Sequence, residues 1–335
     1  MADTTLSQGS AATVRQPSAG EQQQPSPEER AALVAELLKS IHHSHYGPDE
    51  AHVEIHGNEV LGVHLIDGLE VESTSLPDGV QVEIRVLPGA RIAKPVHFCF
   101  GVLPETGVQH IRSRTIVGEG AEATFMAHCT FPNAVNVRHI MQSETVVGCN
   151  ASLRYLERHV HGSGGGQTIE PVTKVTVQDG GRYSTEFELI EGSAGVIELD
   201  YEAEVGANAT VDMRTRIYGR MDDRVHIREA AHLAGEGAVG VLTSHIAMRD
   251  RSSASIENEI VADAPHARGH VDCKEIIQGQ ATARAIPIVQ VNDHSAHVTH
   301  EAAIGSVDSR QLETLMSRGL DEDQATDLII KGLLS

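Results

Sequence analysis

The chain has 335 residues, enough to bury one long repetitive core or two ordinary cores, and its formal net charge is −21. This acidic balance argues against nucleic acid and anionic membrane as partners, because both are bound through concentrated basic surfaces. No apolar run is long enough to span a membrane, and the first residues lack the pattern of a secretory signal, so we expect a cytoplasmic protein.

Four cysteines occur, at positions too far apart for a disulfide framework, and no two of them form a CxxC pair. Their spacing excludes a zinc ribbon and a ferredoxin-like cluster motif in the local sequence. Three of them, Cys99, Cys129 and Cys149, are expected to fill the core as small apolar side chains.

The chain is predicted to begin with a disordered tail over residues 1–25, which are rich in Ser, Gln, Ala and Gly. An N-terminal helical segment over residues 26–52 should follow. Ser26 can cap its helix, and Glu29 stands where the partner in a capping box belongs. Leu33 and Leu37 belong to an apolar stripe that should pack on the body of the protein.

Residues 53–305 alternate between apolar and polar side chains, as strands with one buried face do. Corners of small residues precede successive strands, and their last residues, at 121, 151, 182, 209 and 238, are 30, 31, 27 and 29 positions apart. A unit of about 30 residues with a half-unit of about 15 predicts a parallel β-helix with two strands per turn. A β-sandwich or double cupin barrel stays the alternative, especially for residues 53–112.

His159 and His161 lie within this repetitive region and would share one face of a strand. Two imidazoles so placed could bind a metal ion. A glycine-rich loop over residues 162–166 follows directly and favours an exposed surface turn instead.

Residues 292–305 carry three histidines and two carboxylates in a strand-like segment, and a region of two short helices follows over residues 306–335. Asp308 with Gln311, and Asp321 with Gln324, have the spacing of N-terminal caps. Helices this short are marginal alone, so they should either cap the open end of the β-helix or form a surface for a partner.

The run from His300 to Gly305, followed by Gln311-Leu312, residues 315–320 and residues 328–330, closely resembles the C-terminal signature of the SufB/SufD family of iron–sulfur cluster assembly proteins. The right-handed parallel β-helix of that family agrees with the 30-residue period. The resemblance implies a scaffold rather than an enzyme, which works with a SufC-like ABC ATPase and pairs as a homodimer or with a SufB/SufD-type paralogue. Its cargo would be a transient iron–sulfur cluster of unknown type.

The resemblance also suggests site residues. Glu301 matches a carboxylate implicated in cluster formation in SufB-type members, and His300 matches a histidine implicated in SufD-type members. Because the two are adjacent on a strand, they should point to opposite faces. The helical segment that resembles the ATPase-docking part of the family supplies Leu312, Leu315, Met316, Leu320, Leu328 and Ile329.

Cysteine is where the chain departs from the family pattern. SufB-type members usually carry a cysteine in the turn before the proline that matches Pro287, and residues 279–286 contain none. Cys273 is the remaining candidate, with His270 and Lys274 nearby to favour its thiolate. Because this cysteine is missing, a second interpretation stays open, in which the chain is a SufD-like structural partner that binds no cluster. A polysaccharide-active β-helix enzyme is a weaker alternative, since no tight carboxylate pair repeats and aromatic residues are few.

Overall fold

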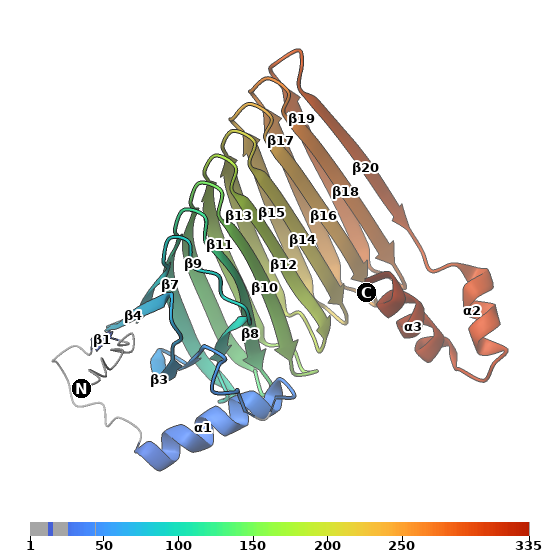
Figure 1. The fold of residues 1–335 in the computed structure, drawn as a ribbon. Helices are drawn as coiled ribbons and strands as arrows, with labels where there is room; N and C mark the ends of the chain where they lie inside the picture. The colour runs from blue at the N-terminus through green and yellow to red at the C-terminus, as the bar shows by residue number, and fades with distance from the viewer. Residues whose placement is uncertain (1–12, 16–25, 44, 335) are drawn as a thin grey trace, which may run out of the picture.

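The computed structural model describes residues 13–15, 26–43 and 45–334. It is a parallel β-solenoid in which the chain alternates between two sheets of ten strands each, and the two sheets face each other across a packed interior (Figure 1). The predicted parallel β-helix is therefore confirmed. Of the predicted disordered tail, all but Thr13–Arg15 lies outside the described residues, and those three residues form a strand.

The first sheet contains, in spatial order, β1 (Thr13–Arg15), β4 (Leu69–Leu76), β5 (Gly79–Val86), β7 (Thr106–Val117), β9 (Asn136–Val147), β11 (Gln167–Val177), β13 (Val196–Val205), β15 (Arg224–Leu233), β17 (Ser253–Ala262) and β19 (Thr282–Val291). The second contains β20 (His297–Gly305), β18 (Arg268–Ile277), β16 (Val239–Met248), β14 (Thr210–Gly219), β12 (Arg182–Glu191), β10 (Ser152–His161), β8 (Glu122–Phe131), β6 (Val96–Gly101), β2 (His52–His56) and β3 (Glu59–His64).

The strand register reproduces the sequence repeat. Ser152 of β10 is paired with Glu122 of β8 on one side and with Arg182 of β12 on the other, an offset of 30 residues each way. The corners need a left-handed backbone, and glycine or asparagine provides it at equivalent places: Gly120 has φ 66° and Asn150 has φ 55°. The corner residues thus fix the length of each coil.

The first strands depart from the parallel rule. β2 pairs with β3, and β4 pairs with β5, as antiparallel ladders, before β2 joins β6 and β5 joins β7 in parallel. The alternative of a β-sandwich or double cupin barrel for residues 53–112 is therefore wrong, although this region does add two antiparallel hairpins to the solenoid.

A continuous apolar core lies between the inner faces of the two sheets and runs from Ala51 to Ala281. α1 (Pro27–Ser40) covers the N-terminal end, and it begins with the predicted capping box of Ser26 and Glu29. Leu37 of α1 packs with Leu61 and Leu103. The predicted docking of this helix on the body is confirmed.

α2 (Ser309–Met316) and α3 (Glu322–Leu334) begin at the predicted caps, because Asp308 accepts from the amide of Gln311 and Asp321 accepts from the amide of Gln324. α3 packs against β14 and β16, through Ile330 and Leu334 on Tyr218 and Ala247. In the described part of the chain, no helix combines the length and apolar character that a membrane crossing requires.

Candidate functional site

The C-terminal end of the solenoid is open. β19 and β20 are the last strands of their sheets, and among the described residues each has a hydrogen-bonded neighbour on one side only. Apolar side chains are exposed here: Ile288 by 36%, Val289 by 37%, Val291 by 44% and Ile304 by 48%. α2 and α3 lie beside this end rather than over it (Figure 1), so the expectation that they cap the open end is wrong.

His300 and Glu301 both lie on β20 and both are exposed. His300 is in register with Val271, a core residue, whereas Glu301 is in register with Asp272 on the outer face. The two side chains therefore point to opposite faces, as expected. On the outer face, Asp272 Oδ2 is 2.9 Å from Lys274 Nζ, and Asp272 and Glu301 both raise the pKa of Lys274.

Cys273 faces the interior and is fully buried. It is in register with Ser244 on one side and with Ala302 on the other. Burial raises the pKa of its thiol to about 12, and the nearby Glu275 acts in the same direction. The expectation that His270 and Lys274 favour a thiolate is wrong, because neighbours on a strand point to the opposite face from Cys273.

The three predicted site residues are thus not brought together as one set of ligands. Cys273 and His300 belong to the inner face and Glu301 to the outer face, and among the described residues the three form no cluster of close donor atoms. His300 and Glu301 are likewise on opposite faces of β20, so the described part of this chain does not bring them together as ligands of one ion.

Two buried carboxylates line the interior near Cys273. Glu229 accepts from Thr215 Oγ1 at 2.6 Å and from Asn258 Nδ2 at 3.3 Å, and burial raises its pKa to about 7. Glu275 has no hydrogen-bond partner at either carboxylate oxygen within the part of the chain that the structure describes, and burial raises its pKa to about 7 as well. Sequence reasoning missed both. For Glu229, the sequence did contain a signal of burial, because this residue occupies an apolar position in the alternating pattern of its strand, between Ile227 and Ala231.

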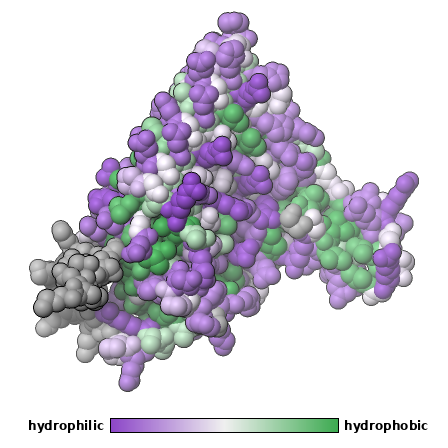
Figure 2. All heavy atoms as spheres, in the orientation of Figure 1, coloured by the Kyte–Doolittle hydropathy of each residue, from purple (hydrophilic) through white to green (hydrophobic). Residues whose placement is uncertain are grey.

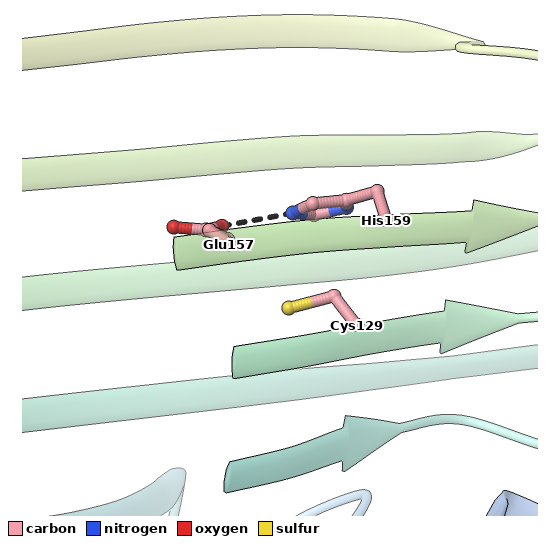
Figure 3. A group of neighbouring side chains, drawn as sticks. All are labelled: Cys129, Glu157 and His159. Carbon is pink, nitrogen blue, oxygen red and sulfur yellow. Dashed lines mark hydrogen bonds and ion pairs between the residues drawn. The ribbon is translucent and has the colours of Figure 1, made fainter. Parts of the chain in front are cut away.

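A third group lies deeper in the interior (Figure 3). Potential ligand atoms of Cys129, Glu157 and His159 all lie within 4.8 Å of one another, and all three side chains are buried. His161, two residues further on, is buried too. The sequence-based interpretation of His159 and His161 as part of an exposed turn is therefore wrong: the loop after them is exposed, but both imidazoles point inward.

Hydrogen bonds connect this interior group to both sheets. Glu157 binds His159 Nε2 at 2.8 Å and accepts from Tyr201 at 2.9 Å. His159 Nδ1 is 3.1 Å from His161 Nε2, and His161 Nδ1 is 2.9 Å from the carbonyl oxygen of Ser193. Burial lowers the pKa of both histidines to about 3, so their imidazoles are neutral, and it raises the pKa of Glu157.

A groove of about 760 Å³ lies at the two C-terminal helices, and its lining is mixed: apolar side chains such as Leu315, Leu328 and Leu333 alternate with polar ones such as Arg310 and Gln311. Apolar side chains gather over these helices at the right of Figure 2. Leu328 is 52% exposed and Met316 is 42% exposed. Of the other predicted docking residues, Leu312 and Ile329 pack partly against the core beneath α3, and Leu320 is half-buried.

Comparison with known proteins adds a family signature to this geometry. The family model described as "SUF system FeS cluster assembly, SufBD core domain" matches residues 102–333. A SufBD family iron–sulfur cluster assembly protein from Methanocaldococcus jannaschii is 36% identical over 310 residues, which cover 90% of this chain and 97% of the relative. One from Pyrococcus horikoshii is 30% identical over 289 residues, covering 86% and 88%. The SufB protein of Bacillus subtilis is 24% identical over 75% of this chain and 54% of its own length.

Proposed function

Because the chain belongs to the SufBD family of iron–sulfur cluster assembly proteins, we propose that it is a scaffold subunit on which a nascent cluster forms at the open end of the solenoid. The observation that carries the proposal is the free edge of strand β20, which is paired with β18 on its other side and exposes His300 and Glu301. Imidazole and carboxylate are both ligands that iron accepts.

Pairing with a second β-solenoid follows from the same end. The free edges of β19 and β20 leave backbone N–H and C=O groups without partners, and a long exposed edge is a template for another chain. The exposed apolar residues Val291 and Ile304 would be buried by such a contact. The partner would be a second copy of this chain or a SufB/SufD-type paralogue. Pairing supplies the additional ligands that one copy of β20 lacks.

The groove between α2 and α3 is proposed as the docking surface for a SufC-like ABC ATPase. Leu328 and Leu315 line it, and α3 is anchored to the solenoid beside it. Tyr218 donates to Asp327 at 2.5 Å, and Arg249 lies 3.0 Å from Asp327 and 2.5 Å from Asp323. These contacts join the groove to β14 and β16. ATP hydrolysis would then belong to the partner, and this chain would not be an enzyme.

A second candidate is a SufD-like structural partner that holds the ATPase but no cluster. The burial of Cys273 favours it, because the thiol is protonated at neutral pH and is not exposed at the open end. All four cysteines are free and would stay reduced in the cytoplasm, the proposed location.

Anaerobic reconstitution tests the scaffold proposal. The chain is co-purified with its ATPase, supplied with iron and sulfide, and examined by visible absorption and Mössbauer spectroscopy. We expect a cluster spectrum that Glu301→Ala and His300→Ala each reduce at least about tenfold, a loss typical for the removal of a metal-site residue. His294→Ala is the matched control, because His294 is exposed in the loop just before β20.

Two results would separate the candidates. A complex that binds its ATPase but stays colourless supports the structural partner and contradicts the scaffold. A cluster that forms equally well in the His300 and Glu301 variants contradicts the proposed site. Cys273→Ser tests the buried thiol in the same assay, and we expect it to retain the cluster if the ligands come from the open edge alone.

A further inference from the structure

The buried group of Cys129, Glu157 and His159 lies far from the proposed assembly site. In the second sheet, β12, β14, β16 and β18 separate β10 from β20. The strand register builds the group: His159 on β10 is directly paired with Cys129 on β8, and Glu157 precedes His159 by two residues on the same inner face. A thiol, an imidazole and a carboxylate are therefore held side by side by the backbone (Figure 3).

We propose that this group binds a divalent first-row transition-metal ion, iron(II) or zinc(II), inside the solenoid. Sulfur, nitrogen and oxygen donors together suit ions of this borderline class. A tetrahedral ion with bonds of about 2.0 to 2.3 Å needs donor atoms about 3.3 to 3.8 Å apart. The three donors already lie within 4.8 Å of one another, so small side-chain movements suffice.

The hydrogen bonds that link His159 to Glu157 and to His161 are compatible with two placements of their protons. In one, His159 Nε2–H donates to Glu157, and Gln167 Nε2–H donates to His161 Nδ1 at 2.9 Å. In the other, which gives up the bond from Gln167, His161 Nδ1–H donates to the Ser193 carbonyl and His159 Nδ1–H donates to His161 Nε2. The second arrangement leaves the lone pair of His159 Nε2 facing Glu157 and Cys129. Histidine ligands of metal ions usually donate their other N–H in this way, which fixes the tautomer and orients the ring.

A second imidazole lies at the same place from the opposite sheet. His139 on β9 is fully buried, and its Nε2 is 3.8 Å from Cys129 Sγ. Its Nδ1 has no hydrogen-bond partner among residues 13–15, 26–43 and 45–334, an arrangement that is costly in an apolar interior. Rotation of this ring toward the ion would supply a fourth donor and complete a tetrahedral set.

Aromatic and apolar side chains close the site. Phe131 and Phe187 are fully buried, and the Phe187 ring lies tilted against the His159 ring with centroids 4.6 Å apart. Since no donor atom is exposed, we expect the ion to enter as the chain folds and to exchange slowly afterwards. This interior site therefore differs from the proposed site at the edge of β20, which would have to bind and release a cluster. The inference of an interior metal ion does not depend on the proposed function.

The test measures the metal content of the full chain, expressed without its ATPase in medium supplemented with cobalt or iron and purified anaerobically. We expect close to one ion per chain, and in the cobalt form a thiolate-to-cobalt charge-transfer band. Cys129→Ala should remove the band, and Cys129→Ala and His159→Gln should each lower the metal content at least about tenfold. Metal content is measured only on variants whose circular dichroism spectrum is that of the wild type.

Cys99→Ala and His294→Gln are the matched controls, since Cys99 is a buried cysteine one coil away, on the outer face of β6, and His294 is exposed. Both should keep the ion. Wild-type protein without metal, or metal retained by both the Cys129 and the His159 variant, would overturn the proposal. The Glu301→Ala variant separates the two hypotheses, because it should lose the assembled cluster and keep this interior ion.

Discussion

At the scale of single residues, the direction in which a strand points its side chains decides their chemistry. Cys273 and Lys274 are adjacent in sequence, yet the cysteine is sealed in the interior while the lysine pairs with Asp272 outside. Glu229 lies inside as well, between Ile227 and Ala231 on β15, where it is hydrogen-bonded to the buried side chains of Thr215 and Asn258. Buried ionisable groups of this kind couple folding to pH.

Glu229 gives a prediction about stability. Burial raises its pKa to about 7 in the folded chain, above the ordinary value of 4.5. The folded state therefore binds more protons than the unfolded state between these values, and stability must fall as pH rises from about 4.5 to about 7. Glu275 acts in the same direction. Glu229→Gln removes part of this dependence, and at pH near 8 it should raise the free energy of unfolding by up to about 3 kcal/mol.

Thermal and urea unfolding at about pH 4.5 and about pH 8 check this expectation. Glu198→Gln on the exposed face of β13 is the control and should change neither value. If Glu229→Gln destabilises the chain equally at both pH values, the hydrogen bonds to Thr215 and Asn258, rather than the buried charge, dominate at this position.

At the scale of elements, the sequence predicted the repeat, the caps and the helices, because each depends on local patterns. The corner residues set the coil length, and Ser26, Asp308 and Asp321 begin their helices through contacts three residues away. The interior groups could not be predicted in this way. Cys129 and Glu157 are 28 positions apart in sequence, and only the register between β8 and β10 brings them together. The sequence did not indicate that His161 is buried, because the glycine-rich loop that follows it favoured an exposed turn.

The helical pair also shows where sequence patterns do not suffice. The predicted docking residues include both Leu328 and Ile329, but Ile329 packs partly against the core, next to the buried residues Ala325, Ile330 and Leu334 of α3. Leu328 is instead 52% exposed and lines the groove. Only the structure therefore distinguishes the apolar residues of α3 that pack in the core from Leu328, which is exposed in the groove.

This difference yields a prediction about the ATPase. Leu328→Asp places a charge in the groove without touching the core, so we expect at least about tenfold weaker binding of the SufC-like ATPase with an unchanged melting temperature. Ile330→Ala is the contrasting variant, since it should lower stability by about 2 to 4 kcal/mol through the cavity it leaves under α3. Calorimetric binding and thermal melts measure both. Full binding by Leu328→Asp would show that the ATPase docks elsewhere.

At the scale of the whole molecule, the two ends of the solenoid differ. Two hairpins and α1 cover the N-terminal end, whereas β19 and β20 leave the C-terminal end uncovered. α3 is held on the side of the second sheet, near β14 and β16. The proposed assembly edge and the proposed ATPase groove are therefore neighbouring but separate surfaces, and we expect that either can be disrupted without the other.

The last prediction concerns pairing. Two chains that each carry a net charge of −21 repel one another at long range, so association must come from apolar and backbone contacts at the open end. Ile304→Asp adds a charge at an exposed apolar position on β20, and we expect it to turn a dimer into a monomer in sedimentation velocity.

Val135→Asp, at a residue 64% exposed in the loop between β8 and β9, should leave the dimer intact. Higher salt should strengthen wild-type association, because it screens the repulsion. A wild-type chain that stays monomeric alone and with a paralogue would contradict pairing, whereas a monomeric Ile304→Asp variant that still binds the ATPase would confirm that the two surfaces act independently.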